Sequence, residues 1–444
     1  MNDFNATVTD RFAFTNISDH DKQELKSSDT TPNNQLKVAE SSSDSDDYLD
    51  VHPVICQELS WSKDGSKLTS VSSDRVIRRY IISRESTTEL PSLSLYSQFS
   101  KNQSIVTSVV SPSDSHILLC SRNLPIQLYP LEPPLDEPTL PENIPTDPSP
   151  VYSYSTTNGQ TEAFETPYSA RFLSPWQFIT GSVRNSVSLY DIERREPLWQ
   201  WRSDKLKCGR AAYKAIVSCF EEQCIPVDGN SSEHLNSNIL HFGTYKNEIY
   251  RADLRTAIGR RAIKPLDLVQ QNNKQGNGIY QILRSDNGMY LYALKRQSDE
   301  IEVYDTRKLS TVVSRLRIPF KVRNQKFKAS LSSYNGLCIG TTHGTMETWD
   351  RSLVESGGIS RNAIENCDLN GHGQDGIPPT TSTSINWGSS NQETDTPTSQ
   401  RINIVKQNPE NPYMAAISYS PDKNDKLSYQ AASDNSGICI VESL

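Results

Sequence analysis

The stretch that decides the fold is 280–307, YQILRSDNGMYLYALKRQSDEIEVYDTR. Apolar and polar residues alternate on both sides of the turn Ser285-Asp286-Asn287-Gly288, and a second polar turn leads into a third alternating run. A period of two residues predicts half-buried β-strands, and Asn-Gly favours a tight turn because both residues tolerate positive φ. The stretch therefore predicts three consecutive antiparallel strands that end on Tyr304-Asp305.

The same pattern recurs along the chain, and Tyr190-Asp191 and Trp349-Asp350 close two further runs. Strand-like clusters lie at 54–83, 104–130, 168–199, 212–254, 280–307, 322–350 and 402–442. Without two long interruptions, residues 51–444 leave about 44 residues for each of seven clusters, which is the repeat length of a WD blade. We therefore expect an all-β fold, a seven-bladed WD-repeat β-propeller.

The two interruptions are predicted to be surface loops. Residues 131–166 are proline-rich, and proline removes the backbone donor that a central strand needs, whereas residues 353–401 are of low complexity. A propeller closes when one terminus lends a strand to the blade of the other. We expect residues 47–56, DYLDVHPVIC, to pair with the last strand, GICIVESL, so that the propeller spans 47–444.

The charge is unevenly spread. The net charge of the 444 residues is −8, but residues 1–50 hold eleven acidic and four basic residues, which leaves the remainder close to neutral. We predict that residues 1–46 form a disordered acidic tail whose Ser/Asp tract at 41–47 is open to phosphorylation. The nearly neutral body is able to carry basic patches.

Several function classes lose support. No stretch of 18 apolar residues predicts a membrane span, and MNDFNATVTD lacks the features of a secretory signal. No nucleophile elbow, zinc-protease motif, Walker-A loop or dinucleotide fingerprint is present, and the cysteines and histidines lack metal-ligand spacing. We expect a monomeric protein without catalytic residues, cofactor, metal or membrane partner.

Basic residues gather at one kind of turn, the turn between the second and third strands of each predicted blade. Because these turns face one rim of a propeller, we expect a partial ring of charge that suits RNA phosphates. The alternative is that each base pairs with a neighbouring carboxylate or is simply hydrated. The candidate phosphate-binding residues are Arg75, Arg122, Arg184, Lys246, Lys295 and Arg296.

A second basic run lies at 315–328, RLRIPFKVRNQKFK. Phe320 and Phe327 are interleaved with the charges, either as stacking platforms or, as their alternation favours, as core residues. The candidate residues of this secondary basic patch are Arg315, Arg317, Lys321, Arg323, Lys326 and Lys328.

Three segments resemble the WD-repeat family of telomerase Cajal body proteins. Residues 120–129, CSRNLPIQLY, are similar to its "S-R-x-x-P-I-x-L-W-D" segment, and 172–194 to its "F-S-P … G … R-x-V-x-x-F-D" blade. Residues 291–305 resemble its fifth blade. Tyr replaces the family's Trp at 129, 190 and 304. With these replacements the pattern most resembles the diverged budding-yeast branch, the Swt-type pre-mRNA splicing proteins.

This resemblance implies a nuclear, non-enzymatic scaffold. In the yeast branch, it implies association with a small nuclear ribonucleoprotein (snRNP) and support of the interaction between that snRNP and the 5′ splice site during pre-mRNA splicing. The animal branch instead implies binding and trafficking of small Cajal-body or telomerase RNA. A generic protein-interaction propeller, such as a ubiquitin-ligase adaptor, is the remaining alternative, and it predicts acidic or apolar rims.

Overall fold

The computed structural model confirms the all-β class. Apart from the short helix α1 (Arg351–Glu355), the regular elements of its described residues are strands in sheets of four or eight. The described residues are 4–11, 54–84, 91–132, 144–157, 163–202, 215–223, 239–254, 263–265, 277–322, 327–332, 336–355, 377–386, 400–421 and 436–443.

Three sheets each hold four antiparallel strands in sequence order, and we call them units 1 to 3. Unit 1 consists of β2 (Cys56–Trp61), β3 (Lys67–Ser72), β4 (Val76–Ser83) and β5 (Ser92–Ser100). Unit 2 consists of β6 (Ile105–Val110), β7 (His116–Ser121), β8 (Ile126–Pro130) and β9 (Tyr152–Tyr154). Unit 3 consists of β10 (Ser169–Ser174), β11 (Gln177–Gly181), β12 (Val187–Asp191) and β13 (Trp199–Trp201).

An eight-stranded sheet contains units 4 and 5, which are joined by the parallel pairing of β14 with β18. Unit 4 consists of β14 (Val217–Gln223), β15 (Ile239–Thr244), β16 (Ile249–Asp253) and β17 (Ile263–Pro265). Unit 5 consists of β18 (Ile279–Arg284), β19 (Tyr290–Lys295), β20 (Glu300–Asp305) and β21 (Lys308–Arg317).

A second eight-stranded sheet contains units 6 and 7, which are joined by the parallel pairing of β25 with β1. Unit 6 consists of β22 (Ser330–Ser332), β23 (Gly336–Gly340), β24 (Thr345–Trp349) and β25 (Thr381–Asn386). Unit 7 consists of β26 (Gln400–Gln407), β27 (Met414–Pro421), β28 (Gly437–Ser443) and β1 (Phe4–Arg11).

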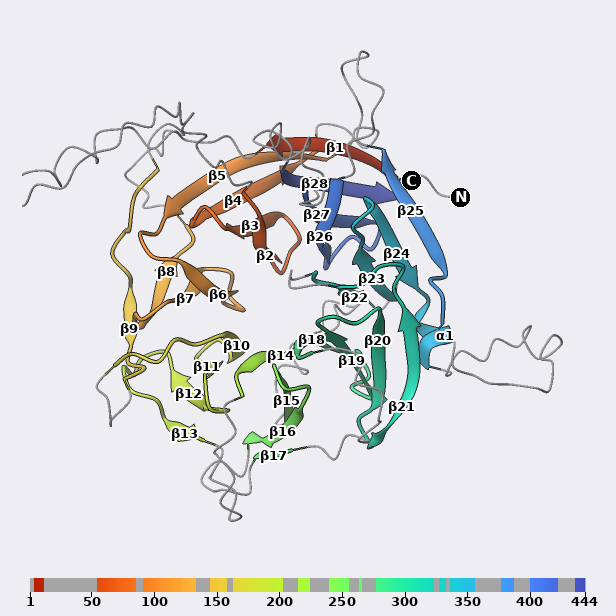
Figure 1. Ribbon diagram of the computed structural model, residues 1–444. Coiled ribbons are helices and arrows are strands. Elements are labelled where there is room, and N and C mark those ends of the chain that lie inside the picture. The colour runs from red at the N-terminus through yellow and green to blue at the C-terminus, as the bar shows by residue number, and fades with distance from the viewer. Residues whose placement is uncertain are drawn as a thin grey trace, which may run out of the picture.

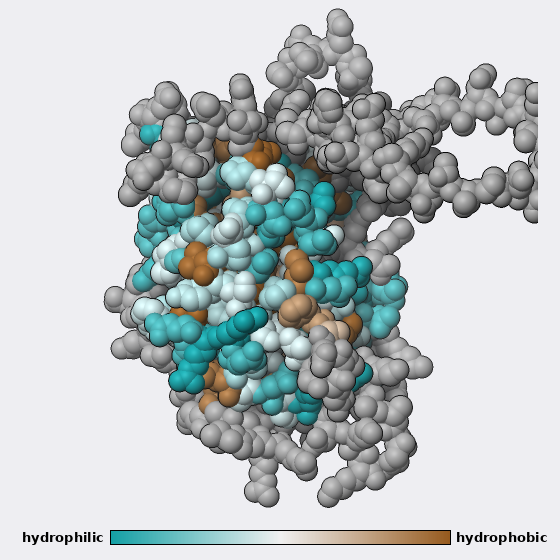
Figure 2. Space-filling model, turned by 90° about the vertical axis from the view of Figure 1, so that its left-hand side faces the viewer, coloured by the Kyte–Doolittle hydropathy of each residue, from teal (hydrophilic) through white to brown (hydrophobic). Residues whose placement is uncertain are grey.

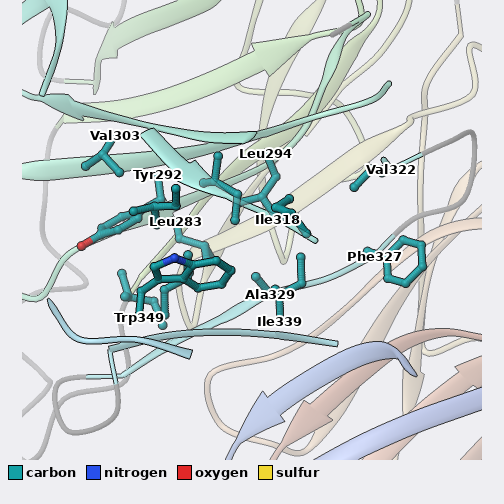
Figure 3. Packing of buried hydrophobic residues seen from close by; sticks show 14 of the residues in the cluster. Leu283, Tyr292, Leu294, Val303, Ile318, Val322, Phe327, Ala329, Ile339 and Trp349 are labelled. Atoms are coloured by element: carbon teal, nitrogen blue, oxygen red, sulfur yellow. The ribbon is translucent and has the colours of Figure 1, made fainter. Parts of the chain in front are cut away.

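The units are arranged around a common centre, with the first strand of each unit innermost (Figure 1). Buried apolar clusters lie between neighbouring units. The cluster between units 5 and 6 includes Tyr292, Leu294 and Trp349 (Figure 3). Another cluster joins Leu59 and Tyr80 of unit 1 to residues of unit 7, so the first and last units also pack together.

The aromatic–Asp step has a structural explanation. Tyr190, Tyr304 and Trp349 are buried at the ends of the third strands. The following Asp accepts a hydrogen bond from the backbone N–H two residues later, as in Asp191 to Glu193 (3.0 Å) and Asp305 to Arg307 (2.9 Å). The aromatic ring thus anchors the strand in the core while the carboxylate starts the next turn.

The predicted closing strand is wrong. Unit 7 is completed by β1, which runs antiparallel to β28 from Phe4 opposite Ser443 to Arg11 opposite Gly437. Residues 54–55 lead into β2 of unit 1, and 47–53 lie outside the described residues. A strand therefore lies inside the segment expected to be a disordered tail, and residues 12–46 of that segment are also outside the described residues.

Both stretches predicted to be loops contain an outer strand. Strand β9 lies within 131–166 and pairs with β8, and β25 lies within 353–401 and pairs with β24. The fourth strand of each of these two units is short or polar and little buried, so its alternation is weak. The sequences YSY and TSTSIN have this character.

Figure 2 looks onto the side of the molecule where β9 and β13 lie in Figure 1, and its described surface is mostly hydrophilic with separate hydrophobic spots. Exposed apolar side chains near these strands are Val151, Tyr152 and Leu198. Among the described residues, no helix has the length and apolar character needed to cross a membrane.

The role of β1 gives a first prediction. Deleting residues 1–11 removes a backbone ladder of seven paired positions from β28, and each lost hydrogen bond costs about 1 kcal/mol. We expect a drop of at least about 5 °C in Tm, measured by differential scanning fluorimetry. Deleting 30–40, which removes the same number of residues, serves as the control. Equal Tm values for the two deletions would contradict the role of β1.

Candidate nucleic-acid interface

The turns between second and third strands lie at one rim, together with the linkers that enter the next unit. Arg75 donates a hydrogen bond to the carbonyl of Asn102, which precedes unit 2 (2.7 Å), and Asn123 N donates to Thr166, which precedes unit 3 (3.0 Å). The same relation recurs between units 4 and 5, where Gly278 N donates to the Asn247 side chain (2.7 Å). We call this edge the basic rim, and it comprises the turns at 74–75, 122–123, 184–185, 246–247, 295–297 and 343–344.

These turns share a left-handed residue. Positive φ occurs at Asn123, Asn247 and Gly344, whose residue types tolerate it, but also at Arg75 (67°) and Arg184 (60°). For a residue with a long side chain this conformation costs on the order of 1 kcal/mol. The turn geometry therefore holds two arginines in an unusual backbone state at the rim.

The rim side chains differ in accessibility. Arg122, Arg184 and Lys246 are exposed, whereas Arg75 and Arg296 are half-buried. Lys295 is ion-paired with Glu302, and its side chain is only 10% exposed. Its neighbour Arg296 instead stacks on Tyr245 of the preceding unit, with 4.1 Å between the guanidinium carbon and the ring centroid.

The rim turns of units 6 and 7 contribute no Arg or Lys among the described residues. His343 is exposed at the turn of unit 6, and the turn Asp434-Asn435 lies outside the described residues. Glu165 is an acid near this rim, and Arg202 pairs with it at 3.1 Å. Arg122 of unit 2, Arg184 of unit 3 and Lys246 of unit 4 thus face solvent, and the described ion pairs contain no acidic counterpart for Arg122 or Arg184.

The secondary basic patch does not form one surface. Arg315 and Arg317 lie on the outer strand β21, with Arg315 3.7 Å from Glu300, while Lys328 is ion-paired with Glu58 of unit 1. Lys321 is exposed, and Arg323 and Lys326 lie outside the described residues. Phe320 and Phe327 are buried, which confirms that they are core residues.

A central cavity of about 220 Å³ is lined mainly by first strands, and sequence reasoning missed its charged residues other than Lys328. Lys406 of unit 7 reaches Glu222 of unit 4 at 2.8 Å, and Lys328 reaches Glu58. Glu221 accepts a hydrogen bond from His241 (2.7 Å). The detectable signal was Glu221-Glu222 directly after the apolar residues Cys219 and Phe220 of the same strand, since charges buried in a strand need partners.

The carboxylates of Glu221 and Glu222 are held in the ionised form. Burial alone would raise the pKa of Glu221, but the hydrogen bond from His241 and the charges of Arg171 and Arg284 lower it below its ordinary value. Burial likewise opposes ionisation of Glu222, and Lys406 and Lys328 more than offset it, so its pKa is also lowered. Each acid is therefore paired with a base. Within the described part of the chain, no cluster of three or more His, Cys, Asp or Glu is arranged to hold a metal.

Comparison with known proteins finds relatives that share one name, Protein SWT21. The chain is 37% identical over 388 residues to Protein SWT21 of Kluyveromyces lactis, covering 84% of this chain and 82% of that protein. It is 37% identical over 400 residues to Protein SWT21 of Zygosaccharomyces rouxii, covering 88% and 85%. Protein SWT21 of Saccharomyces cerevisiae is 33% identical over 384 residues, covering 82% of this chain and 96% of that protein. No protein-family model matches the chain.

Proposed function

Because the chain belongs to the family of Protein SWT21, we propose that it is a non-enzymatic nuclear scaffold of an snRNP that acts in pre-mRNA splicing. Its role is to stabilise the contact between the snRNP and the 5′ splice site. The resemblance of residues 120–129, 172–194 and 291–305 to the Swt-type splicing proteins supports this role.

The scaffold is a closed seven-bladed WD-repeat propeller. Three observations support closure: seven four-stranded units in the described residues, the packing of unit 1 against unit 7, and ion pairs that span the centre. A closed ring presents rigid rims and leaves only short, protected sheet edges, which suits a monomeric platform for larger particles.

The observation that carries the proposal is the basic rim. Arg122, Arg184 and Lys246 come from three consecutive units and are exposed on the same edge. Arginine forks bind phosphate bidentately and stay charged at every relevant pH. A row of such groups on a nearly neutral body supports direct contact with the RNA of the snRNP.

The central cavity supports a non-enzymatic role. A general acid needs a raised pKa, whereas the pKa values of Glu221 and Glu222 are lowered. Ion pairs between units are also what a scaffold requires, because they fix one unit against another across the cavity.

The basic rim gives a second prediction. Reversing the charges of Arg122, Arg184 and Arg296 together to Glu is expected to weaken RNA association by at least about ten-fold and to flatten its salt dependence. Each lost phosphate contact removes about one unit of the slope of log affinity against log salt. Fluorescence anisotropy with labelled snRNA between low and physiological salt measures both effects.

A matched control lies on the opposite rim. Arg194, Arg195 and Arg307 are exposed in turns between third and fourth strands, so their reversal changes the net charge equally. We expect the control to keep most of the parent's affinity and slope. If both triple variants behave alike, only net charge matters and the rim has no specific role.

The opposite rim favours a second candidate function, protein docking. Trp176 (65% exposed), Tyr413 (60%) and Met289 (41%) lie in turns between first and second strands. Exposed Trp and Tyr on rigid turns are typical anchors of protein interfaces. This function replaces RNA contact if Trp176→Ala releases proteins from the purified particle while the basic-rim variant leaves RNA association unchanged.

A further inference from the structure

Arg296 and Tyr245 form a stacked pair at the boundary of units 4 and 5. The guanidinium carbon lies 4.1 Å from the ring centroid, and Nη2 donates to the phenolic oxygen at 3.1 Å. Both side chains are half-buried. The pair thus joins two neighbouring turns of the basic rim.

The backbone around the pair is fixed by hydrogen bonds. Arg296 N donates to the carbonyl of Gly278 (2.9 Å), and Asn277 N donates to the carbonyl of Arg296 (2.6 Å). Gly278 has a φ of +96°, and a Cβ there would lie 2.8 Å from the carbonyl oxygen of Tyr245. The linker therefore packs directly on the tyrosine, so the stack is set before any ligand arrives.

Arg296 differs from its neighbour in the partner it uses. The partner described for the Arg296 side chain is the neutral Tyr245, whereas Lys295 is neutralised by Glu302. Arg296 therefore keeps its positive charge and holds its planar group in one orientation. Unpaired nucleobases in RNA complexes stack on such guanidinium planes and on aromatic rings.

We propose that the Tyr245–Arg296 pair is a stacking site for an unpaired nucleobase, so that the basic rim takes single-stranded rather than duplex RNA. Exposed Lys246, next to Tyr245, and Arg184 of unit 3 contact the flanking phosphates. This inference rests on the proposed RNA contact. A duplex offers phosphates, but its bases are already stacked on one another and are not free to occupy the site.

The test uses the full-length protein and three fluorescent RNAs of equal length: a single strand, its duplex, and the single strand with abasic sites. We expect the single strand to bind at least about ten-fold more tightly than the abasic strand. Arg296→Lys keeps the charge but removes the plane, so it should weaken single-strand binding about ten-fold with an unchanged salt slope. Tyr245→Leu should act in the same direction.

Arg194→Lys is the matched control, since Arg194 is an exposed arginine in a turn of the opposite rim. We expect it to change single-strand binding by less than about two-fold. Parent affinities that are equal for all three RNAs, or an Arg296→Lys variant with parental affinity, would overturn the stacking site while leaving the phosphate contact in place. A parent that binds none of the three RNAs would overturn the proposed RNA contact as well.

Discussion

A protein that ends at residue 435 is expected to have no cooperative thermal transition. The deletion removes β28, which pairs with β27 on one side and β1 on the other. Ile438, Cys439, Ile440 and Val441 are 0–1% exposed, and burial of each large apolar side chain contributes about 1.5–3 kcal/mol. Their sum is comparable to the whole stability of a typical domain.

Circular dichroism and calorimetry measure the loss of this transition. Aggregation of the truncated protein would also show that it does not fold. A milder variant, Ile440→Ala, should cost about 2–5 kcal/mol because it leaves a cavity between units 1 and 7. Tyr413→Ala, at an exposed turn of the same unit, should change stability by less than about 0.5 kcal/mol. A soluble truncated protein with the parent's Tm would show that β28 is dispensable.

The strands that sequence reasoning found are those with a buried face and a strong turn signal. The run 280–307 became β18, β19 and β20, with the turn Ser285–Gly288 between the first two. Tyr304 and Trp349 were recognised because one large buried ring followed by Asp is a local pattern. Such patterns can be recognised in the sequence because alternation and turn chemistry depend on only a few neighbouring residues.

The features that were missed depend on distant partners. Strand β1 reads FNATVTDR and becomes a strand only beside β28, more than 400 residues away in sequence. The pairing of Lys406 with Glu222 likewise joins units 7 and 4. No local pattern encodes these contacts, because only the folded chain brings both partners together. The rim arginines were predictable since repeated turns share one edge, but the stacking of Arg296 on Tyr245 was not.

The buried carboxylate of Glu221 supports a further prediction, on stability and its pH dependence. Its side chain is 1% exposed and lies 2.7 Å from His241 Nδ1, 3.3 Å from Arg284 and 3.4 Å from Arg171. Glu221→Gln keeps the size but leaves two arginines without their shared anion. Breaking a buried pair in this way costs about 3–5 kcal/mol, which urea denaturation at neutral pH measures.

The acid limb of the stability curve separates this charge effect from packing. The pKa of Glu221 is lower in the folded protein than in the unfolded chain, so the folded state binds fewer protons in the interval between the two values. Its contribution is fully present above the unfolded pKa of about 4.3 and is lost as pH falls through the folded value. The free energy of unfolding of the parent should therefore fall more steeply below about pH 4.3 than that of Glu221→Gln, so that the two curves converge in acid.

The control is Glu193→Gln, at an exposed turn, whose curve of unfolding free energy against pH should run parallel to that of the parent throughout. Parallel curves for Glu221→Gln and the parent would mean that the residue contributes by shape alone, and that the ion pairs of Glu221 do not hold units 3, 4 and 5 together.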